Sequence, residues 1–338
     1  MKIKLKSIHE QVIVITGASS GIGLVTAKMA AERGAKLVLA ARNEEALSEL
    51  TNEITKSGGK AVYVIADVGD EDNVNRIAEL AVAEYGGFDT WVNNAGVSIF
   101  GLIESVTIAD MKKMFDTNFW GVVYGSRAAV KHYKETQKAV AIINVGSFFG
   151  DRATPVQSTY SASKHALHGF TDALRMELEA AEVPIVVTTI HPGRIDTPYN
   201  EHARSYMLQQ PAHRGYIYPP QSVAEAILFA AAHPKRDMFV GFQAKFFAVM
   251  GTIAPRLTDK IMEKWMFYSQ VANRPSRGRE DNALYKPGYG LQERGTHEGY
   301  VRSGSMYVTM SKNPVLTSIA IAGLGAIIFT LFKGKNNT

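Results

Sequence analysis

The sequence contains no cysteine among its 338 residues. Disulfide bridges, thiolate zinc sites and cysteine nucleophiles are therefore excluded, so any catalysis must use oxygen and nitrogen side chains. The N-terminal stretch, Met1 to Ile8, alternates lysine with apolar residues and lacks the apolar run of a secretory signal. We therefore expect the bulk of the chain to lie in the cytosol. The absence of cysteine fits such a reducing compartment.

Excess charge is also missing from most of the chain. Residues 1–255 carry 25 Lys and Arg against 26 Asp and Glu, whereas residues 256–338 carry 12 against 6, which together give the net charge of +5. A basic C-terminal segment is typical of a solvated linker, and it can also contact an anionic surface. Basic residues do not alternate with aromatic ones in a stripe, so we expect no nucleic-acid partner.

One long apolar run is present, at the C-terminal end. Val315 to Phe332 is an uncharged stretch of 18 mostly apolar residues, flanked by lysines at 312, 333 and 335. As a helix it would be about 27 Å long, slightly short of a typical hydrocarbon core. We predict a membrane anchor at 315–332; a buried or oligomerisation helix is the alternative. Lysines on both sides leave the orientation open.

Apolar, β-rich runs alternate with amphipathic stretches through most of the chain, at Gln11–Thr16, Lys36–Ala41, Ala61–Ala66, Asp89–Asn93, Val140–Val145, Ile185–Ile190 and Met238–Val240. Continuous apolar strands separated by helices predict a single doubly wound parallel sheet, a Rossmann-type α/β fold. We expect a catalytic domain over 1–255, an amphipathic helical extension over 256–273 and a basic polar linker over 274–314. The apolar tail helix follows.

The turn after the first strand is rich in glycine, with Gly17, Gly21 and Gly23 in Thr-Gly-Ala-Ser-Ser-Gly-Ile-Gly, and a helical pattern follows. Glycine lets the backbone approach a pyrophosphate closely, and the helix N-terminus favours its charge. The second strand ends at Ala41 and Arg42, where a carboxylate would bind a free ribose diol and an arginine accommodates a 2′-phosphate. The sequence therefore favours NADP(H) over NAD(H).

Tyr160 and Lys164 lie four residues apart at the start of a helical stretch. That spacing places both side chains on one helical face. An ammonium group near a phenol favours the phenolate, so we expect Lys164 to lower the pKa of Tyr160 and to make this tyrosine an acid–base group near neutral pH.

Over residues 8 to about 245, the chain resembles the short-chain dehydrogenase/reductase family. The resemblance rests on the three glycines, on Asp67 after the third strand, on Asn93-Asn94-Ala95-Gly96, on Asn118, on Ser147 before Tyr160, and on Pro192-Gly193 with Thr197. It implies an oxidoreductase that interconverts an alcohol and a carbonyl with a nicotinamide cofactor. The residues it assigns to the cofactor are Gly17, Ser19, Ser20, Gly21, Ile22, Gly23, Arg42, Asp67, Val68, Asn94, Ala95, Gly96, Tyr160, Lys164, Pro192, Gly193, Ile195 and Thr197.

The same resemblance implies four catalytic roles. Tyr160 exchanges a proton with the substrate oxygen, Ser147 hydrogen-bonds that oxygen, Lys164 holds the nicotinamide ribose and tunes Tyr160, and Asn118 orders a water. The family also commonly assembles through the helices that carry Asn118 and Tyr160, which implies a homo-oligomer. We expect no metal site, because His165, His168 and His191 have no carboxylate or further ligand at a suitable spacing in the sequence.

The segment from Arg194 to Pro220 resembles the family's substrate lid and is rich in aromatic residues, and Phe100, Phe148 and Phe149 lie beside active-site motifs. Aromatic lining suits a lipophilic alcohol or ketone, although the same rings could pack the lid against the domain. Two other functions stay open: a non-catalytic nucleotide-binding scaffold at a membrane, and a sugar-nucleotide epimerase or dehydratase. Fold alone does not separate them from an oxidoreductase.

Overall fold

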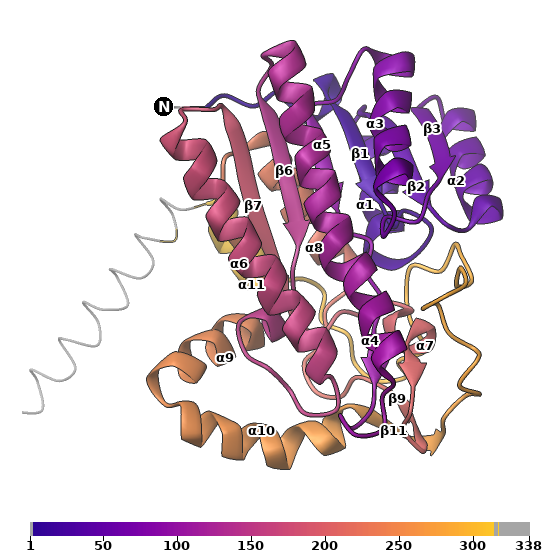
Figure 1. Cartoon of the computed structure of the whole chain (residues 1–338), viewed down its shortest axis with the longest axis vertical. Helices are drawn as coiled ribbons and strands as arrows, with labels where there is room; N and C mark the ends of the chain where they lie inside the picture. The colour runs from indigo at the N-terminus through magenta and orange to yellow at the C-terminus, as the bar shows by residue number, and fades with distance from the viewer. Residues whose placement is uncertain (1–2, 314–316, 318–338) are drawn as a thin grey trace, which may run out of the picture.

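The computed structural model describes residues 3–313 and residue 317. Seven parallel strands form its central sheet, in the order β10-β7-β6-β4-β1-β2-β3 (Figure 1). Their bounds are β1 Val12–Thr16, β2 Lys36–Ala41, β3 Lys60–Ile65, β4 Thr90–Asn93, β6 Val140–Val145, β7 Ile185–Pro192 and β10 Asp237–Val240. The strands agree with the seven predicted ones to within two residues, and the predicted Rossmann-type sheet is confirmed.

Helices cover both faces of this sheet (Figure 1). The helices α1 Gly21–Glu32, α2 Glu44–Lys56 and α8 Pro220–Ala232 pack in one core, and α3 Glu71–Tyr85, α5 Gly121–Thr136 and α6 Ser158–Ala180 pack in the other. Along β1, Ile13 and Ile15 face the first core, whereas Val12 and Val14 face the second. This alternation follows from the two-residue period of a strand, and it explains why both faces of β1 are apolar.

Shorter elements surround the edge where the strands end. They are β5 Ile99–Phe100, α4 Ile108–Phe115, the π-helical turn η2 Asp116–Trp120, η3 Phe148–Gly150, α7 Tyr199–His202, β8 Arg204–Ser205 and β9 Gln209–Pro211. At the opposite edge, η1 Ile8–Glu10 precedes β1. Strand β5 pairs with β8, and β9 pairs antiparallel with β11 Val271–Pro275. These small pairs join the lid region to the loop after β4 and to the C-terminal part of the chain.

A helix covers most of the extension predicted over 256–273, and another helix precedes it. Two helices follow the sheet, α9 Phe242–Ile253 and α10 Pro255–Ser269, and they meet at Ala254 (Figure 1). Proline lacks a backbone N–H and is preorganised for the first turn of a helix, so Pro255 starts α10 and prevents α9 from continuing through it. Met262 and Met266 of α10 are buried on its inner side.

Residues 274–313 do not form the extended linker that the sequence predicts. The backbone of this segment returns across the domain and bonds to it: the Leu291 N–H donates to the Ser19 carbonyl and the Arg302 N–H to the Ile217 carbonyl. Leu284 is fully buried, and α11 Met306–Lys312 packs against β10 and α8. The sequence is misleading here because backbone groups, a few apolar side chains and scattered polar ones such as Tyr285 and Ser305 make these contacts.

The predicted membrane anchor at 315–332 falls outside the described residues, apart from Thr317. Within residues 3–313, the helices are too short or too polar to cross a bilayer. The structure therefore leaves the anchor as a prediction from sequence.

Candidate active site

A cleft opens beyond the carboxyl ends of β1, β4, β6 and β7, where ligands bind in doubly wound sheets. It collects nearly all of the predicted site residues: Gly17, Ser19, Ser20, Gly21, Ile22, Arg42, Asp67, Val68, Asn94, Ala95, Gly96, Ser147, Tyr160, Lys164, Pro192, Gly193, Ile195 and Thr197. Gly23 and Asn118 are not part of the lining. They lie directly behind it, and each shapes a part of the wall.

The glycine-rich turn joins β1 to α1 and leaves no room for side chains. A Cβ on Gly23 would lie 2.1 Å from the Gly17 carbonyl oxygen, and a Cβ on Gly17 would lie 2.8 Å from the Cα of Ala95. Gly17 also has a φ of 67°, which other residues rarely adopt. Gly21 and Ile22, at the start of α1, line the cleft, and a helix N-terminus favours an anion; the Gly21 N–H itself donates to the Gln292 carbonyl.

Asn94 connects the end of β4 to that turn. Its side-chain amide donates to the Thr16 carbonyl at 3.0 Å and to the Gly17 carbonyl at 3.3 Å, and its backbone N–H donates to the Thr16 hydroxyl at 3.0 Å. These bonds fix the glycine-rich turn against the loop that carries Ala95 and Gly96. Asn94 is therefore a positioning residue for this part of the cleft.

Tyr160 and Lys164 lie on one face of α6 at the floor of the cleft, with 8% and 5% of their surface exposed. The Lys164 Nζ donates to the Val145 carbonyl at 2.8 Å and is 5.8 Å from the centre of the Tyr160 ring. Burial lowers the pKa of Lys164 to about 8. The rest of the ammonium's donor capacity is available to a ligand in the cleft.

The pKa of Tyr160 lies above its usual value, which differs from the predicted lowering by Lys164. Burial of the phenol raises this pKa, and hydrogen bonds involving Ser147 and Tyr199 act in the opposite direction but do not offset it. Loss of hydration penalises the charged phenolate more strongly than neighbouring dipoles stabilise it. In the cofactor-free chain Tyr160 is therefore a neutral phenol and can donate a proton.

Ser147 is positioned by the turn that follows β6. Its hydroxyl oxygen accepts the Phe149 N–H at 3.1 Å and caps the short helix η3. Because an oxygen in this position accepts from the backbone, its own proton can be donated into the cleft.

Asn118 lies in the π-helical turn between α4 and α5 and is fully buried. Its side-chain oxygen accepts the Val97 N–H at 2.9 Å, while its amide donates to the Val97 carbonyl at 3.0 Å and to the Ser163 hydroxyl at 3.2 Å. π-Helical turns often occur at functional sites. Here the side chain of Asn118 joins the loop after β4 to α6, the helix of Tyr160 and Lys164.

The lid contributes a second tyrosine that the sequence analysis did not single out as a site residue. The Tyr199 hydroxyl lies 2.8 Å from the Ser98 hydroxyl and 2.7 Å from the Gln157 side-chain oxygen, and its ring centre is 5.6 Å from that of Tyr160. His213 stacks on Tyr199, and burial, together with the charge of Arg194, lowers its pKa to about 3. The lid thus places neutral aromatic groups beside Tyr160. Only their concentration in the segment 194–220 hints at this in the sequence.

At the opposite end of the cleft, Arg42 has partners that the sequence did not indicate. Its guanidinium donates to the Leu284 carbonyl at 3.1 Å and to the Ala283 carbonyl. Nearby, the Asp67 carboxylate accepts hydrogen bonds from Lys113 Nζ at 3.0 Å and from the Gly69 N–H at 3.0 Å. Burial opposes ionisation of Asp67, but these two bonds keep its pKa below the usual value. Ala283, Pro287, Gly288 and Tyr289 complete the lining.

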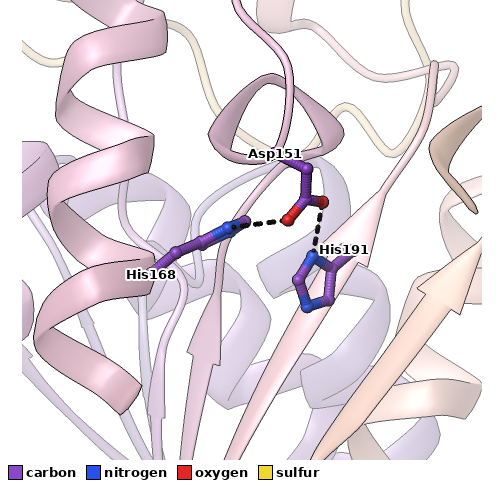
Figure 2. Close-up of side chains that lie close together, drawn as sticks. All are labelled: Asp151, His168 and His191. Carbon is purple, nitrogen blue, oxygen red and sulfur yellow. Dashed lines mark hydrogen bonds and ion pairs between the residues drawn. The ribbon is translucent and has the colours of Figure 1, made fainter. Parts of the chain in front are cut away.

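Asp151, His168 and His191 form a cluster next to η3, in which His191 is buried and the other two are partly buried (Figure 2). The Asp151 carboxylate is 2.9 Å from His191 Nδ1 and 3.2 Å from His168 Nδ1, and His191 Nε2 is 3.1 Å from Asp237. Burial opposes the charge of His191, yet the two carboxylates raise its pKa above the usual value. The sequence analysis found no carboxylate for these histidines, because the η3 turn, α6 and β7 come together only in the fold.

The contacts in this cluster are those of an imidazolium between two carboxylates. Both nitrogens of His191 face a carboxylate oxygen at hydrogen-bond distance, so they act as donors. Asp151 directly follows η3, and Gly146 and Gly150 on either side of Ser147 pack against the His168 ring. The cluster therefore supports the turn that presents Ser147.

The groups around the cleft fit a nicotinamide dinucleotide. The glycine-rich turn leaves backbone space beside a helix N-terminus for a pyrophosphate, and a buried ammonium with unused donors lies at the inner end for a ribose. Arg42 and Asp67 lie at the outer end, about where the second strand and third strand finish. From the outer to the inner end of the cleft, these features match the adenosine, the pyrophosphate and the nicotinamide ribose.

Comparisons with known proteins agree with this arrangement. The family model described as short chain dehydrogenase matches residues 11–207. The uncharacterized oxidoreductase YxnA of Bacillus subtilis is 62% identical over 326 residues, covering 96% of this chain and 92% of its own. An uncharacterized oxidoreductase of Staphylococcus aureus is 34% identical over 230 residues, covering 67% of this chain and 93% of its own.

Two solved structures are also similar. A short-chain dehydrogenase/reductase from Burkholderia phymatum in complex with NAD has a TM-score of 0.66 at 26% identity and covers 78% of this chain and 97% of its own. An alcohol dehydrogenase from Thermococcus sibiricus, complexed with 5-hydroxy-NADP, has a TM-score of 0.59 at 23% identity, covers 68% and 95%, and supports the fold. The chain is therefore an oxidoreductase that belongs to the short-chain dehydrogenase/reductase family.

Proposed function

We propose that the protein interconverts an alcohol and a ketone or aldehyde, with a nicotinamide dinucleotide as the redox partner. The observation that carries the proposal is the buried constellation of Ser147, Tyr160 and Lys164 at the floor of the cleft. A neutral phenol, a hydroxyl donor and an ammonium meet there, shielded from water. Such donors stabilise the negative charge that develops on a carbonyl oxygen.

The bound nicotinamide supplies the hydride for reduction, or accepts it for oxidation. In the reductive direction, Tyr160 gives its proton to the substrate oxygen as the carbonyl becomes an alcohol, and Ser147 donates a hydrogen bond to the same oxygen. The phenolate that remains on Tyr160 is stabilised by the charge of Lys164, whose ammonium lies 5.8 Å from the ring centre. Asn118 positions Ser163 and the loop at Val97, and thereby α6; its ordering of a water stays a prediction.

The test is cofactor oxidation by the purified full-length chain on a panel of aldehydes and ketones, with Ser147→Ala and Tyr160→Phe as comparisons. We expect wild-type turnover with at least one carbonyl and a loss of roughly a hundredfold or more in each variant, the range of acid–base and oxyanion contributions. Cofactor affinity, measured by calorimetry, should change little in Ser147→Ala, because Ser147 is not among the residues assigned to the cofactor. Undiminished turnover in Tyr160→Phe would contradict the proposed chemistry.

A preference for NADP(H) is supported by the position of Arg42 at the end of β2, next to the cleft, without a carboxylate at Ala41. Two of the five guanidinium N–H donors of Arg42 are bonded to backbone carbonyls, and the others are left for a phosphate. We therefore propose NADP(H) as the preferred cofactor, with a preference that these two contacts reduce.

A lipophilic substrate is the further proposal for this cleft. Phe148, Phe149 and Tyr199 line it beside Tyr160, and His213 is neutral there because of its lowered pKa. Apolar and aromatic walls with a few polar groups suit a bulky apolar carbonyl compound. We expect kcat/KM to rise from small polar carbonyls to long-chain or polycyclic ones; faster reduction of small sugars would refute this.

Attachment to a membrane and homo-oligomerisation remain proposals from the sequence and the family. Membrane attachment requires residues 315–332. Its test is flotation of the full chain with liposomes, compared with a chain that ends at residue 313. Homo-oligomerisation is supported by two exposed apolar side chains. Trp120, directly before α5, exposes 45% of its surface, and Met176 on α6 exposes 62%. Sedimentation equilibrium should give more than one chain per particle, and a strict monomer would contradict the proposal.

The two other functions make different predictions for the same assay. A nucleotide-binding scaffold would bind the cofactor tightly and leave every carbonyl on the panel unreduced. A sugar-nucleotide epimerase or dehydratase would act on a sugar nucleotide without net oxidation of added NAD(P)H.

A further inference from the structure

We propose that residues Ala283–Gln292, here named the strap, form the outer wall of the adenosine pocket and reduce the preference of this pocket for a 2′-phosphate. The inference rests on the proposed function, because it concerns the same cofactor cleft. The strap lies far beyond residue 207, where the match to the family model ends. Four of its residues line the cleft: Ala283, Pro287, Gly288 and Tyr289.

The strap is bound to the glycine-rich turn through the backbone. The Leu291 N–H donates to the Ser19 carbonyl at 2.8 Å, and the Gly21 N–H donates to the Gln292 carbonyl at 2.8 Å. Ser19 and Gly21 belong to the turn that would hold a pyrophosphate. The strap therefore continues the wall of the phosphate site outward, toward the adenosine end.

A second set of contacts connects the strap to the start of α2. The side-chain amide of Asn43 donates to the Gly288 carbonyl at 2.9 Å. Gly290 packs so closely on α2 that a Cβ there would lie 2.2 Å from the Cβ of Ala46. Glycine is needed at 290 for this approach, since carbon atoms cannot come so close.

The other side of the strap is fixed to the substrate lid. The Ala283 N–H donates to the His202 carbonyl at 2.8 Å, and Leu284 is fully buried in a cluster that includes Met114 and Phe149. The strap thus runs from the lid, at α7, to the glycine-rich turn, and it lines the cleft between them. A wall held from both sides can confine a ligand.

The chemistry of the strap distinguishes the two cofactors. Its carbonyls at Ala283 and Leu284 accept hydrogen bonds from Arg42, the residue on which a 2′-phosphate would depend. Carbonyl oxygens beside the ribose can accept a hydrogen bond from a free 2′-hydroxyl, whereas they repel the negative oxygens of a phosphate. The strap consequently reduces the advantage of NADP(H) over NAD(H), because it takes up part of the donor capacity of Arg42, and displacing the strap would return that capacity to a 2′-phosphate.

Gly290→Ala in the full-length chain tests this, because its Cβ must push the strap away from α2. The matched control is Gly304→Ala, whose Cβ would meet no atom within 4 Å. A second comparison is the double variant Ala46→Gly with Gly290→Ala, which restores the space that the single variant fills. Circular dichroism and thermal unfolding establish that each variant is folded.

The measurement is the dissociation constant of NADH and of NADPH by isothermal titration calorimetry, without substrate. In Gly290→Ala we expect NADH to bind about tenfold more weakly, equivalent to ~1.4 kcal/mol, and NADPH to lose less than roughly threefold. Gly304→Ala should match the wild type, and the double variant should recover most of the loss.

Equal constants in Gly290→Ala and Gly304→Ala would overturn the inference, and so would an equal loss for both cofactors or no recovery in the double variant. Failure of the proposed function gives a different result: a folded wild-type chain that binds neither NADH nor NADPH. The two failures are therefore distinguishable in one titration series.

Discussion

Replacing Lys164 by methionine should stabilise the cofactor-free chain while it abolishes activity. Lys164 has 5% of its surface exposed, and its ammonium donates to the Val145 carbonyl at 2.8 Å. Methionine has a similar length and carries no charge, so it removes the cost of burying an ammonium. The substitution therefore separates what Lys164 costs the fold from what it gives to the chemistry.

The magnitude follows from the lowered pKa. Burial reduces the pKa of Lys164 from 10.5 to about 8, and at ~1.36 kcal/mol per pH unit this corresponds to a cost of ~3 kcal/mol at pH 7. Leaving the Val145 carbonyl without its partner costs about 1 kcal/mol. We expect the methionine variant to gain about 2 kcal/mol in free energy of unfolding at pH 7.

The pH dependence has a definite sign. Because the folded pKa lies below the unfolded one, the unfolded chain binds more protons between about pH 8 and pH 10.5, and wild-type stability rises with pH in this window. The cost of Lys164 is complete below pH 8 and falls to ~1 kcal/mol at pH 10. The advantage of the variant should then be close to zero.

Urea unfolding without cofactor, at pH 7 and pH 10, measures both effects, with carbonyl reduction assayed in parallel. Lys131→Met, at an exposed position of α5, is the control and should change stability little at either pH. A Lys164→Met chain that is less stable than wild type at pH 7, or whose advantage persists unchanged at pH 10, would refute the reasoning.

Other substitutions test separate parts of the structure. Gly169 lies inside α6, and a Cβ there would meet no atom within 4 Å. Because alanine favours the helix more than glycine, Gly169→Ala should raise the free energy of unfolding by about 0.5–1 kcal/mol in urea titrations. A lower free energy of unfolding would mean that α6 is packed differently there. Asp151→Asn should lower stability by about 2–3 kcal/mol, less than for fully buried pairs because the Asp151 side chain is 21% exposed. This loss should be largest between about pH 4 and 6.5. Below that window the stabilisation from ionised Asp151, whose pKa is lowered, is lost; above it the stabilisation from protonated His191, whose pKa is raised, is lost. Thermal melts from pH 4 to 9 check the profile, and a loss that grows above pH 8 would speak against the ion pair.

The sheet and the inner half of the cleft were predictable from the sequence. Strands β1 and β4 are buried on both faces, and their ends carry the turn residues of the glycine-rich loop and the Asn94 segment. Tyr160 and Lys164 share a helical face simply because four residues make about one turn. Local sequence determines these features, and the fold assembles them in the expected place.

The outer half of the cleft was not predictable in the same way. The strap binds Arg42 and Ser19 through backbone groups, which leave no trace in residue types. Its buried contact at Leu284 comes from one aliphatic residue in a polar stretch. Partners about 240 residues away in the chain decide what Arg42 does, and no local pattern reports such contacts.

The electrostatics also depend on the fold. The spacing of Tyr160 and Lys164 indicates an attraction that lowers the phenol pKa, but burial of both groups reverses the outcome for Tyr160 in the cofactor-free chain. Asp151 meets His168 and His191 only because the turn after Ser147, α6 and β7 come together in the fold (Figure 2). Burial and long-range proximity are properties of the assembled core.

The most direct measurement for the central claim compares two tyrosines whose ring centres are 5.6 Å apart. Single-turnover reduction of the best carbonyl is followed in full-length Tyr160→Phe and Tyr199→Phe, each saturated with reduced cofactor. If Tyr160 is the proton donor, its variant loses roughly a hundredfold or more in rate, while Tyr199→Phe stays within about tenfold of wild type. A Tyr160→Phe chain that reacts as fast as Tyr199→Phe would contradict the account.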